Sequence, residues 1–283
     1  APLTKPRSVL GFDIGRVWHP TYICIVSGHI YGYYNRMVER LISTKIRSSR
    51  KGVLLMGPRQ TGKSTLLTSL DPDLTINLAR ENEFLRYASD IDLFSGQVES
   101  GGFKTVFVDE IQRIPGLLNT IQAIIDERGS KAAIRFLLSG SSARKLRRGQ
   151  ANLLPGRVLS YQLGGLCAAE LNYEVDTNRA LKYGFLPGVF LERKSSLCEK
   201  ILESYSAVYL KEEIQAEALS RNIQGFARFL MVIAVSAGQV LDLSKLASKA
   251  KVSRTSCTRF LEVMEDTLIA QRVECFGEVQ AAD

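Results

Sequence analysis

The sequence predicts an α/β fold, in which a sheet of parallel strands is covered by helices. The prediction rests on three runs of mostly apolar or β-branched residues, at 53–56, 105–108 and 134–138, each followed at once by glycine, carboxylate or serine residues. Near-continuous apolar runs are typical of strands buried on both faces, as the strands of parallel sheets are. Stretches of helical character separate these runs, a charged one over 80–99 and an amphipathic one over 111–128, which is the alternation that a parallel sheet requires.

A glycine-containing loop follows the first run. Residues 57–64 satisfy the pattern G-x-x-x-x-G-K-[ST], and residues 64–70 have the character of a helix. Strand, loop and helix together predict a phosphate-binding loop, because the glycines let successive backbone N–H groups wrap an anion at the helix N-terminus. Lys63 is expected to reach the β- and γ-phosphates of ATP, and Ser64 to bind Mg²⁺. A glycine turn that binds nothing is the alternative, and it would not need the Lys-Ser pair. The residues predicted to bind the nucleotide are Gly57, Pro58, Arg59, Gln60, Thr61, Gly62, Lys63, Ser64 and Thr65.

Two carboxylates close the second run. Asp109 and Glu110 follow residues 105–108 directly, so a buried parallel strand would deliver both at its carboxyl end, where open α/β sheets bind their ligands. Asp109 is expected to hold Mg²⁺ through water, and Glu110 to polarise the attacking water. An acidic turn after a core strand is the alternative, and the pairing with Lys63 argues against it.

Small polar residues close the third run. In P-loop ATPases with an additional strand, the strand beside the carboxylate strand ends in a residue that senses the γ-phosphate, and Ser139 or Ser141 holds that position here. Basic residues follow, and one of them would act on a neighbour's phosphate as an arginine finger. For each taken singly, a solvated surface position is the alternative. They are Arg144, Lys145, Arg147, Arg148 and Arg157.

Taken together, segments 57–64, 107–112, 138–146 and 154–157 resemble the prokaryotic AAA+-type ATPases often described only as ATP-binding proteins. The resemblance extends roughly over residues 34–270 and implies an ATPase core, a helical lid and a C-terminal winged helix. It also implies that Arg157 lies near the nucleotide or the next subunit of a homo-oligomer. Family members usually continue into a further C-terminal domain, which this chain, ending at Asp283, is expected to lack.

Composition is that of an ordinary globular protein, with 45% hydrophobic and 23% charged residues among 283. The net charge of +8 favours polyanionic partners such as nucleotides or nucleic acid, although part of the excess would serve the ATP site. The 5 cysteines form no C-x-x-C pair and the chain has only 2 histidines, so neither a zinc site nor a disulfide framework is indicated. With no membrane-length apolar run and no signal peptide in residues 1–12, a cytoplasmic protein is expected.

The remaining patterns divide the chain into an N-terminal extension (1–34), the ATPase core (35–172), a helical lid (173–225) and a winged-helix domain (226–283). Residues 8–15 and 22–26 read as two strands. Their Asp13 slightly resembles the opening of ribonuclease-H-like nucleases, but no acidic constellation follows to hold metals. Residues 34–47 predict an amphipathic helix, whose basic residues are expected to be solvated: Arg36, Arg40, Lys45 and Arg47.

Two short helices near the C-terminus read as a helix-turn-helix, over 243–250 and 254–265, with Ser253 as the N-cap of the second. If this unit reads duplex DNA, its second helix enters the major groove and lysines contact phosphates; a lid or protein contact is the alternative of equal weight. The residues expected at the groove are Arg254, Thr255, Ser256 and Arg259, and those at phosphates are Lys245, Lys249 and Lys251.

These patterns together predict Mg²⁺-dependent ATP binding and slow hydrolysis, coupled to a conformational or assembly change. A DNA-binding regulator with a nucleotide switch and little turnover is the first alternative. A nucleotide or small-molecule kinase is the second, and it is disfavoured because Asp109 and Glu110 suit the activation of water.

Overall fold

The computed structural model describes residues 24–26, 29–31, 38–128, 134–141, 146, 154–216 and 223–273. The chain divides into two compact units, Ala1–Met37 and Val38–Asp283. In the first unit, β1 (Cys24–Val26) pairs antiparallel with β2 (His29–Tyr31). The expected strand at 22–26 therefore overlaps β1, whereas the one at 8–15 lies outside the described residues.

The second unit is built on a parallel sheet of 5 strands, in the order β4-β5-β6-β3-β7, which confirms the predicted α/β class. The strand that leads into the phosphate loop and the strand that ends in the carboxylates are not neighbours, because β6 lies between them. The strands are β3 (Gly52–Met56), β4 (Leu74–Asn77), β5 (Thr105–Asp109), β6 (Arg135–Gly140) and β7 (Val158–Gln162).

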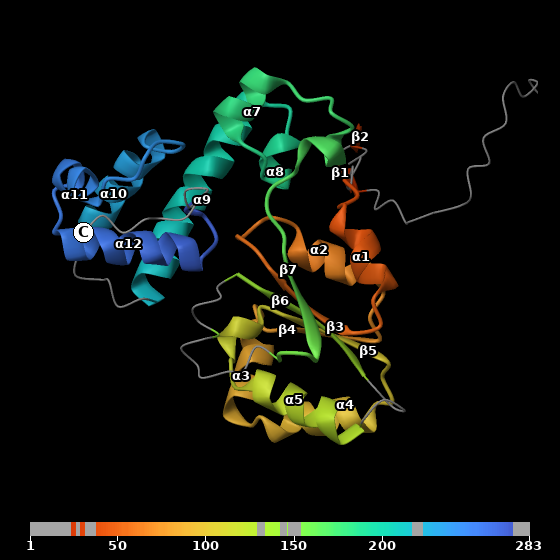
Figure 1. Ribbon diagram of the computed structural model, residues 1–283. Coiled ribbons are helices and arrows are strands. Elements are labelled where there is room, and N and C mark those ends of the chain that lie inside the picture. Colours follow the sequence, from red (N-terminus) through yellow and green to blue (C-terminus); the bar gives the residue numbers. More distant parts are fainter. Residues whose placement is uncertain are drawn as a thin grey trace, which may run out of the picture. The chain divides into compact units, whose positions relative to one another are not determined.

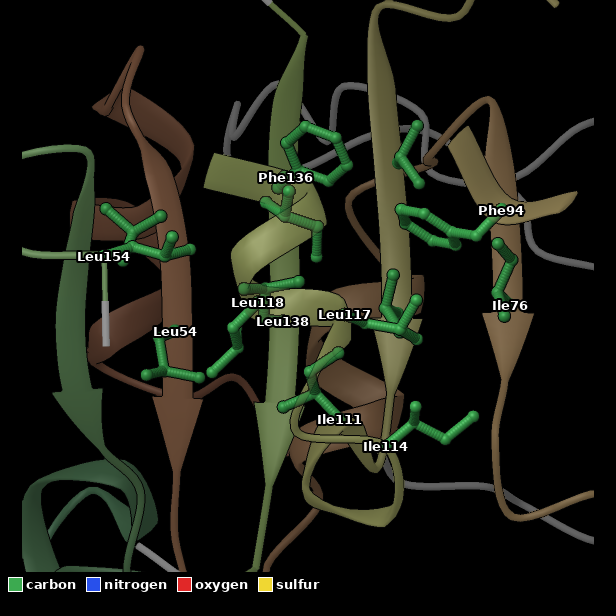
Figure 2. Packing of buried hydrophobic residues seen from close by; sticks show 14 of the residues in the cluster. Leu54, Ile76, Phe94, Ile111, Ile114, Leu117, Leu118, Phe136, Leu138 and Leu154 are labelled. Atoms are coloured by element: carbon green, nitrogen blue, oxygen red, sulfur yellow. The ribbon is translucent and has the colours of Figure 1, made fainter. Parts of the chain in front are cut away.

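Helices cover both faces of this sheet (Figure 1). Successive side chains of a strand point to opposite faces, so Leu54 and Leu138 pack with α3, α4 and α5, whereas Leu55 and Leu137 pack with α1 and α2. Figure 2 shows the first of these layers, with Leu117 and other α5 residues against the strands. The helices are α1 (Ile42–Ser48), α2 (Lys63–Thr68), α3 (Glu81–Ser89), α4 (Asp92–Ser100) and α5 (Leu117–Arg128).

The helices depart from the sequence prediction at three places. The stretch 80–99 is two helices, α3 and α4, broken at Asp90. The stretch 111–128 is a short 3-10 helix, η1 (Ile111–Arg113), followed by α5, since Pro115 has no N–H to continue a helix through it. The helix expected over 34–47 begins only at Ile42 among the described residues.

A series of helices follows the sheet. Asp176 caps the first α-helix of the series, and Ser253 caps α12 by accepting from the Ser256 N–H at 3.1 Å, as predicted. The expected helix-turn-helix is confirmed as α11 and α12, but residues 223–273 contain no strand that could form a wing. The elements are η2 (Ala168–Leu171), α7 (Thr177–Tyr183), α8 (Pro187–Phe190), α9 (Ser195–Ala216), α10 (Ile223–Val235), α11 (Leu243–Ala250) and α12 (Arg254–Asp266).

The last three helices have an apolar cluster of their own. Phe260 lies 5.1 Å from Phe226 and 5.6 Å from Phe229, measured between ring centroids. The other buried members of this cluster come from α10, α11 and α12, and partly buried residues of the segments next to α12 pack against them. Within the described part of the chain, no helix combines the length and apolar character that crossing a bilayer requires.

Candidate nucleotide site

The phosphate loop connects the buried strand β3 to α2. Gly57, the first glycine of the loop, donates its N–H to the Gly140 carbonyl at 3.2 Å, and Gly140 is the last residue of β6. A Cβ atom on Gly57 would lie 2.2 Å from the Leu163 carbonyl oxygen, so only glycine allows this close approach of the loop to the segment after β7. Gly62 has a φ of 88°, in the left-handed region that glycine adopts without strain. The loop therefore needs both glycines for reasons of backbone geometry.

Lys63 is the first residue of α2 and is only 4% exposed. Its ammonium donates to the Gly57 carbonyl at 2.9 Å and to the Pro58 carbonyl at 2.8 Å, so the side chain folds back over the loop. Burial lowers the pKa of Lys63, and the nearby carboxylates Glu110 and Asp109 partly offset that effect. A phosphate placed in the loop would favour the charged ammonium further.

The carboxylate of Asp109 accepts hydrogen bonds from two serine hydroxyls. Its Oδ1 atom accepts from Ser64 Oγ at 2.8 Å and also from Ser139 Oγ. A serine hydroxyl and a buried carboxylate so close together are oxygen ligands of the kind that Mg²⁺ takes beside phosphates. The chemistry of the donor set therefore fits the predicted ion, with Ser64 and Asp109 as the residues that would hold it.

Glu110 is held from two sides at the end of β5. Its backbone is left-handed, with a φ of 58°, and its N–H donates to Ser139 Oγ at 3.0 Å. Its carboxylate oxygen Oε2 accepts from Gln112 Nε2 and from Ser141 Oγ, the latter at 3.3 Å. Gln112 also donates to Ser141 Oγ at 3.0 Å, and it is only 6% exposed. This network fixes the direction in which the Glu110 carboxylate points.

Two cavities adjoin the loop. One has a volume of about 420 Å³ and the other about 570 Å³, and Tyr205 of α9 lines both. The smaller one holds the charged groups of the phosphate loop together with Glu110, and the larger one has apolar walls from Leu163, Leu186, Leu268 and Ile269. The larger cavity is also lined by Glu265 and Arg272, so the two differ in which charged groups they hold. Apolar walls next to the phosphate loop suit a ligand with a phosphate end and an aromatic end.

Arg157 lies elsewhere in this chain. It precedes β7, which runs parallel to β3, so it sits at the edge of the sheet opposite to the phosphate loop. Its guanidinium forms a bidentate pair with Asp126, with both N···O distances at 2.7 Å. The structure thus brings together Lys63, Ser64 and Asp109 but leaves Arg157 apart from them. The basic residues Arg144, Lys145, Arg147 and Arg148 lie outside the described residues.

Sequence reasoning missed several polar residues around the site. The sequence prediction assigns no role to Gln112, and its expectation that Arg40 is solvated is wrong, because Arg40 is only 8% exposed. It donates to the Thr61 carbonyl and pairs with Glu170 at 2.9 Å. Helical spacing places Gln112 away from the apolar positions 111, 114 and 118, so the sequence offered no signal for it, and the burial of Arg40 depends on Glu170, far along the chain.

Comparison with known families agrees with this geometry. Residues 49–172 match the family described as AAA domain, and residues 175–282 match a domain of unknown function (DUF8612). The segment 49–172 therefore carries an AAA domain, the domain of AAA+-type P-loop ATPases. No curated protein matches the chain.

Solved structures resemble the chain only distantly. Orc1 of Aeropyrum pernix in complex with DNA has a TM-score of 0.34 at 11% identity, with 80% of each chain covered. PCH-2 of C. elegans has a TM-score of 0.36 at 14% identity, covering 81% of this chain and 66% of its own. Domain III of the replication initiator DnaA of Thermotoga maritima has a TM-score of 0.31 at 13% identity, covering 74% and 88%. Similarities of this size carry no conclusion about function.

Proposed function

We propose that the protein binds Mg·ATP at the phosphate loop and hydrolyses it slowly, and that the hydrolysis drives a conformational or assembly change. The observation that carries the proposal is the convergence on one point of Ser64 and Asp109, 2.8 Å apart, beside the buried ammonium of Lys63. Lys63 and Ser64 come from α2 and Asp109 from the end of β5, and a phosphate with its cation is the ligand that uses all three.

Each residue has a distinct part in this proposal. Lys63 and the loop N–H groups neutralise and hold the phosphates, and Ser64 with Asp109 holds Mg²⁺, which would neutralise charge on the β- and γ-phosphates. Glu110, fixed by Gln112 and Ser141, orients and polarises the attacking water. Ser139, which contacts both Asp109 and the Glu110 N–H, is placed to relay the state of the γ-phosphate between them.

The test is a titration of ATP with Mg²⁺, together with steady-state phosphate release. Lys63→Ala is expected to lose most of the affinity, and Glu110→Gln to bind ATP like the wild type but release no phosphate. Lys51→Ala is the matched control, because Lys51 directly precedes β3, the strand that leads into the phosphate loop. In the described structure, its ammonium contacts only the Gly156 carbonyl, at 3.3 Å. Unchanged affinity in Lys63→Ala would remove the site assignment.

A role for Arg157 in catalysis requires a neighbouring copy of the chain, given its place opposite to the phosphate loop. In this version of the proposal, a homo-oligomer forms with ATP and the arginine leaves Asp126 to reach the neighbour's phosphates. Light scattering with and without ATP measures the assembly. A protein that hydrolyses ATP as a monomer, at a rate unchanged in Arg157→Ala, would exclude this role.

The second candidate is a DNA-binding regulator. It is favoured by exposed basic residues on α11 and α12, where Lys249, Arg254 and Arg259 accompany the exposed Thr255 and the half-exposed Ser256. Binding to duplex DNA should weaken steeply with salt, since each neutralised phosphate releases counterions. Arg254→Ala should flatten that dependence, whereas Lys200→Ala on α9 should not. Absence of binding at low ionic strength would end this candidate.

A further inference from the structure

Arg40 precedes α1 and is a buried charge that joins separate segments of the AAA domain. Its Nη1 donates to the Thr61 carbonyl of the phosphate loop at 2.6 Å. Its Nη2 donates to the carbonyls of Gly164 and Gly165, at 3.0 and 3.1 Å, in the segment after β7. Its Nε donates to Glu170 Oε1 at 2.9 Å, in η2. All three guanidinium nitrogens therefore have acceptors, of which Thr61 belongs to the phosphate loop and Gly164 and Gly165 line the larger cavity beside it.

Glu170 completes this arrangement. Its side chain is 5% exposed, and it accepts not only from Arg40 but also from the N–H groups of Leu41 at 2.9 Å and Cys167 at 3.1 Å. Burial alone would raise the pKa of Glu170, but these hydrogen bonds outweigh it and hold the pKa below its usual range. The pair is thus charged and fully hydrogen-bonded, which is the condition under which a buried ion pair is tolerated.

The contact with Thr61 has a direct consequence for the loop. In a trans peptide the carbonyl and the following N–H point in opposite directions, and the chain has no cis peptide bonds. Because the Thr61 carbonyl faces the Arg40 guanidinium, the Gly62 N–H faces away from Arg40, and this N–H is one of the loop donors expected to bind phosphate. A single charge-assisted bond at 2.6 Å therefore acts on the orientation of a phosphate donor.

We infer that Arg40 is a positioning residue, which sets the phosphate loop in its anion-binding form and joins it to the segment after β7. This inference rests on the proposed nucleotide site. The forked guanidinium of Arg40 is essential, because the side chain of a lysine has a single nitrogen, which cannot reach Thr61, Gly164 and Glu170 together. The donors that Arg40 orients act on phosphate, so its effect falls on ligands that carry a β-phosphate.

The test compares Arg40→Lys with Arg135→Lys. Arg135 is a matched control, because it is a half-buried arginine that donates to the carbonyls of Ile46 and Lys51, away from the phosphate loop. Affinities for ATP, ADP and AMP are measured by competition, well below each variant's melting temperature. Arg40→Lys is expected to lose about tenfold in affinity for ATP and ADP but less than about twofold for AMP. Arg135→Lys should leave all three affinities unchanged.

A purely structural role of Arg40 would lower the melting temperature and leave the ratio of ADP to AMP affinity as in the wild type, which would overturn the inference. Should Arg40→Lys fail to fold, the double variant Arg40→Gln, Glu170→Gln decides in its place, since it leaves no buried charge unpaired and still lacks the contact to Thr61. The same loss is expected of it. A wild-type protein that binds none of the nucleotides would instead contradict the proposed function itself.

Discussion

The hydroxyl of Ser64 lies 2.8 Å from the Oδ1 atom of Asp109, although the strands that lead to these residues are separated in the sheet by β6. The gap is filled by Ser139 at the end of that middle strand, whose hydroxyl donates to the same carboxylate oxygen. The carboxylate is therefore aimed at the phosphate loop from a distance of two strands. We therefore expect Asp109 to account for the effect of Mg²⁺ on the affinity for ATP.

Asp109→Asn should weaken ATP binding by about tenfold or more in the presence of Mg²⁺ and change it little in EDTA. The amide keeps the shape and an oxygen for Ser64, but it lacks the charge that Mg²⁺ requires. Titrations of ATP with and without the chelator measure the difference. Asp126→Asn, which alters an exposed carboxylate paired with Arg157, serves as the control. Equal losses in both conditions would indicate damage to the loop and not to a metal site.

Gln112→Ala should lower phosphate release by about fivefold to tenfold and leave the affinity for ATP unchanged. Gln112 donates to the Glu110 carboxylate, which lines the smaller cavity together with Lys63 and Ser64. Loss of the amide lets that carboxylate rotate out of its fixed direction, at the expense of the water-activating step. The control is Gln122→Ala on α5. A faster release in Gln112→Ala would mean that the amide restrains Glu110 instead of positioning it.

Much of this site could be predicted from sequence because its parts are local. The loop 57–65 and the pair Asp109 and Glu110 each follow an apolar run, and strand ends in a parallel sheet meet at one edge. Arg40 could not be predicted in the same way. Its helical neighbours Lys45 and Arg47 are exposed, as expected, and only the fold brings Glu170 to it.

The interruption between η1 and α5 is a second feature that the sequence pattern did not predict. Apolar residues at 111, 114, 117, 118 and 121 fit one helix, and all of them are buried. Pro115 interrupts the backbone between them without disturbing their burial. Periodicity therefore identified the buried face correctly but not the course of the chain, because burial of side chains constrains the backbone only loosely.

Gly57→Ala should destabilise the AAA domain and abolish ATP binding. The added Cβ would lie 2.2 Å from the Leu163 carbonyl oxygen, a backbone atom of a segment that itself donates to Met56 at 2.8 Å. This clash can be removed only if the phosphate loop and the segment after β7 move apart. Gly96→Ala is the control, since its Cβ would meet nothing within 4 Å on α4 and alanine favours a helix by about 0.5–1 kcal/mol. Thermal unfolding with and without ATP measures both variants.

Glu170→Gln should make the stability of the protein less dependent on pH in the acid range. The pKa of Glu170 is held below its usual range in the folded protein, so its ionised form stabilises the fold fully above the unfolded pKa, about 4.3. That contribution is lost as the pH falls through the lower, folded pKa. As the pH falls below about 4.5, the wild type should therefore lose more stability than the variant. Urea unfolding at several pH values measures this, and parallel curves would contradict it.

Phe260→Ala should unfold α10, α11 and α12 at a lower temperature and leave ATP binding intact below that transition, where the cavity walls at Leu268 and Ile269 are still in place. The ring packs edge-on against Phe226 and contacts Phe229, and truncation of such a buried aromatic side chain costs about 3–5 kcal/mol. The cluster contains residues of these three helices and of the short segment after them, so the damage should stay local. Calorimetry of the variant should show a separate early transition. Met231→Ala, at a site 71% exposed on α10, should not produce one. A single transition shifted as a whole in Phe260→Ala would mean that the helices and the AAA domain unfold as one cooperative unit, against the predicted domain boundary at residue 226.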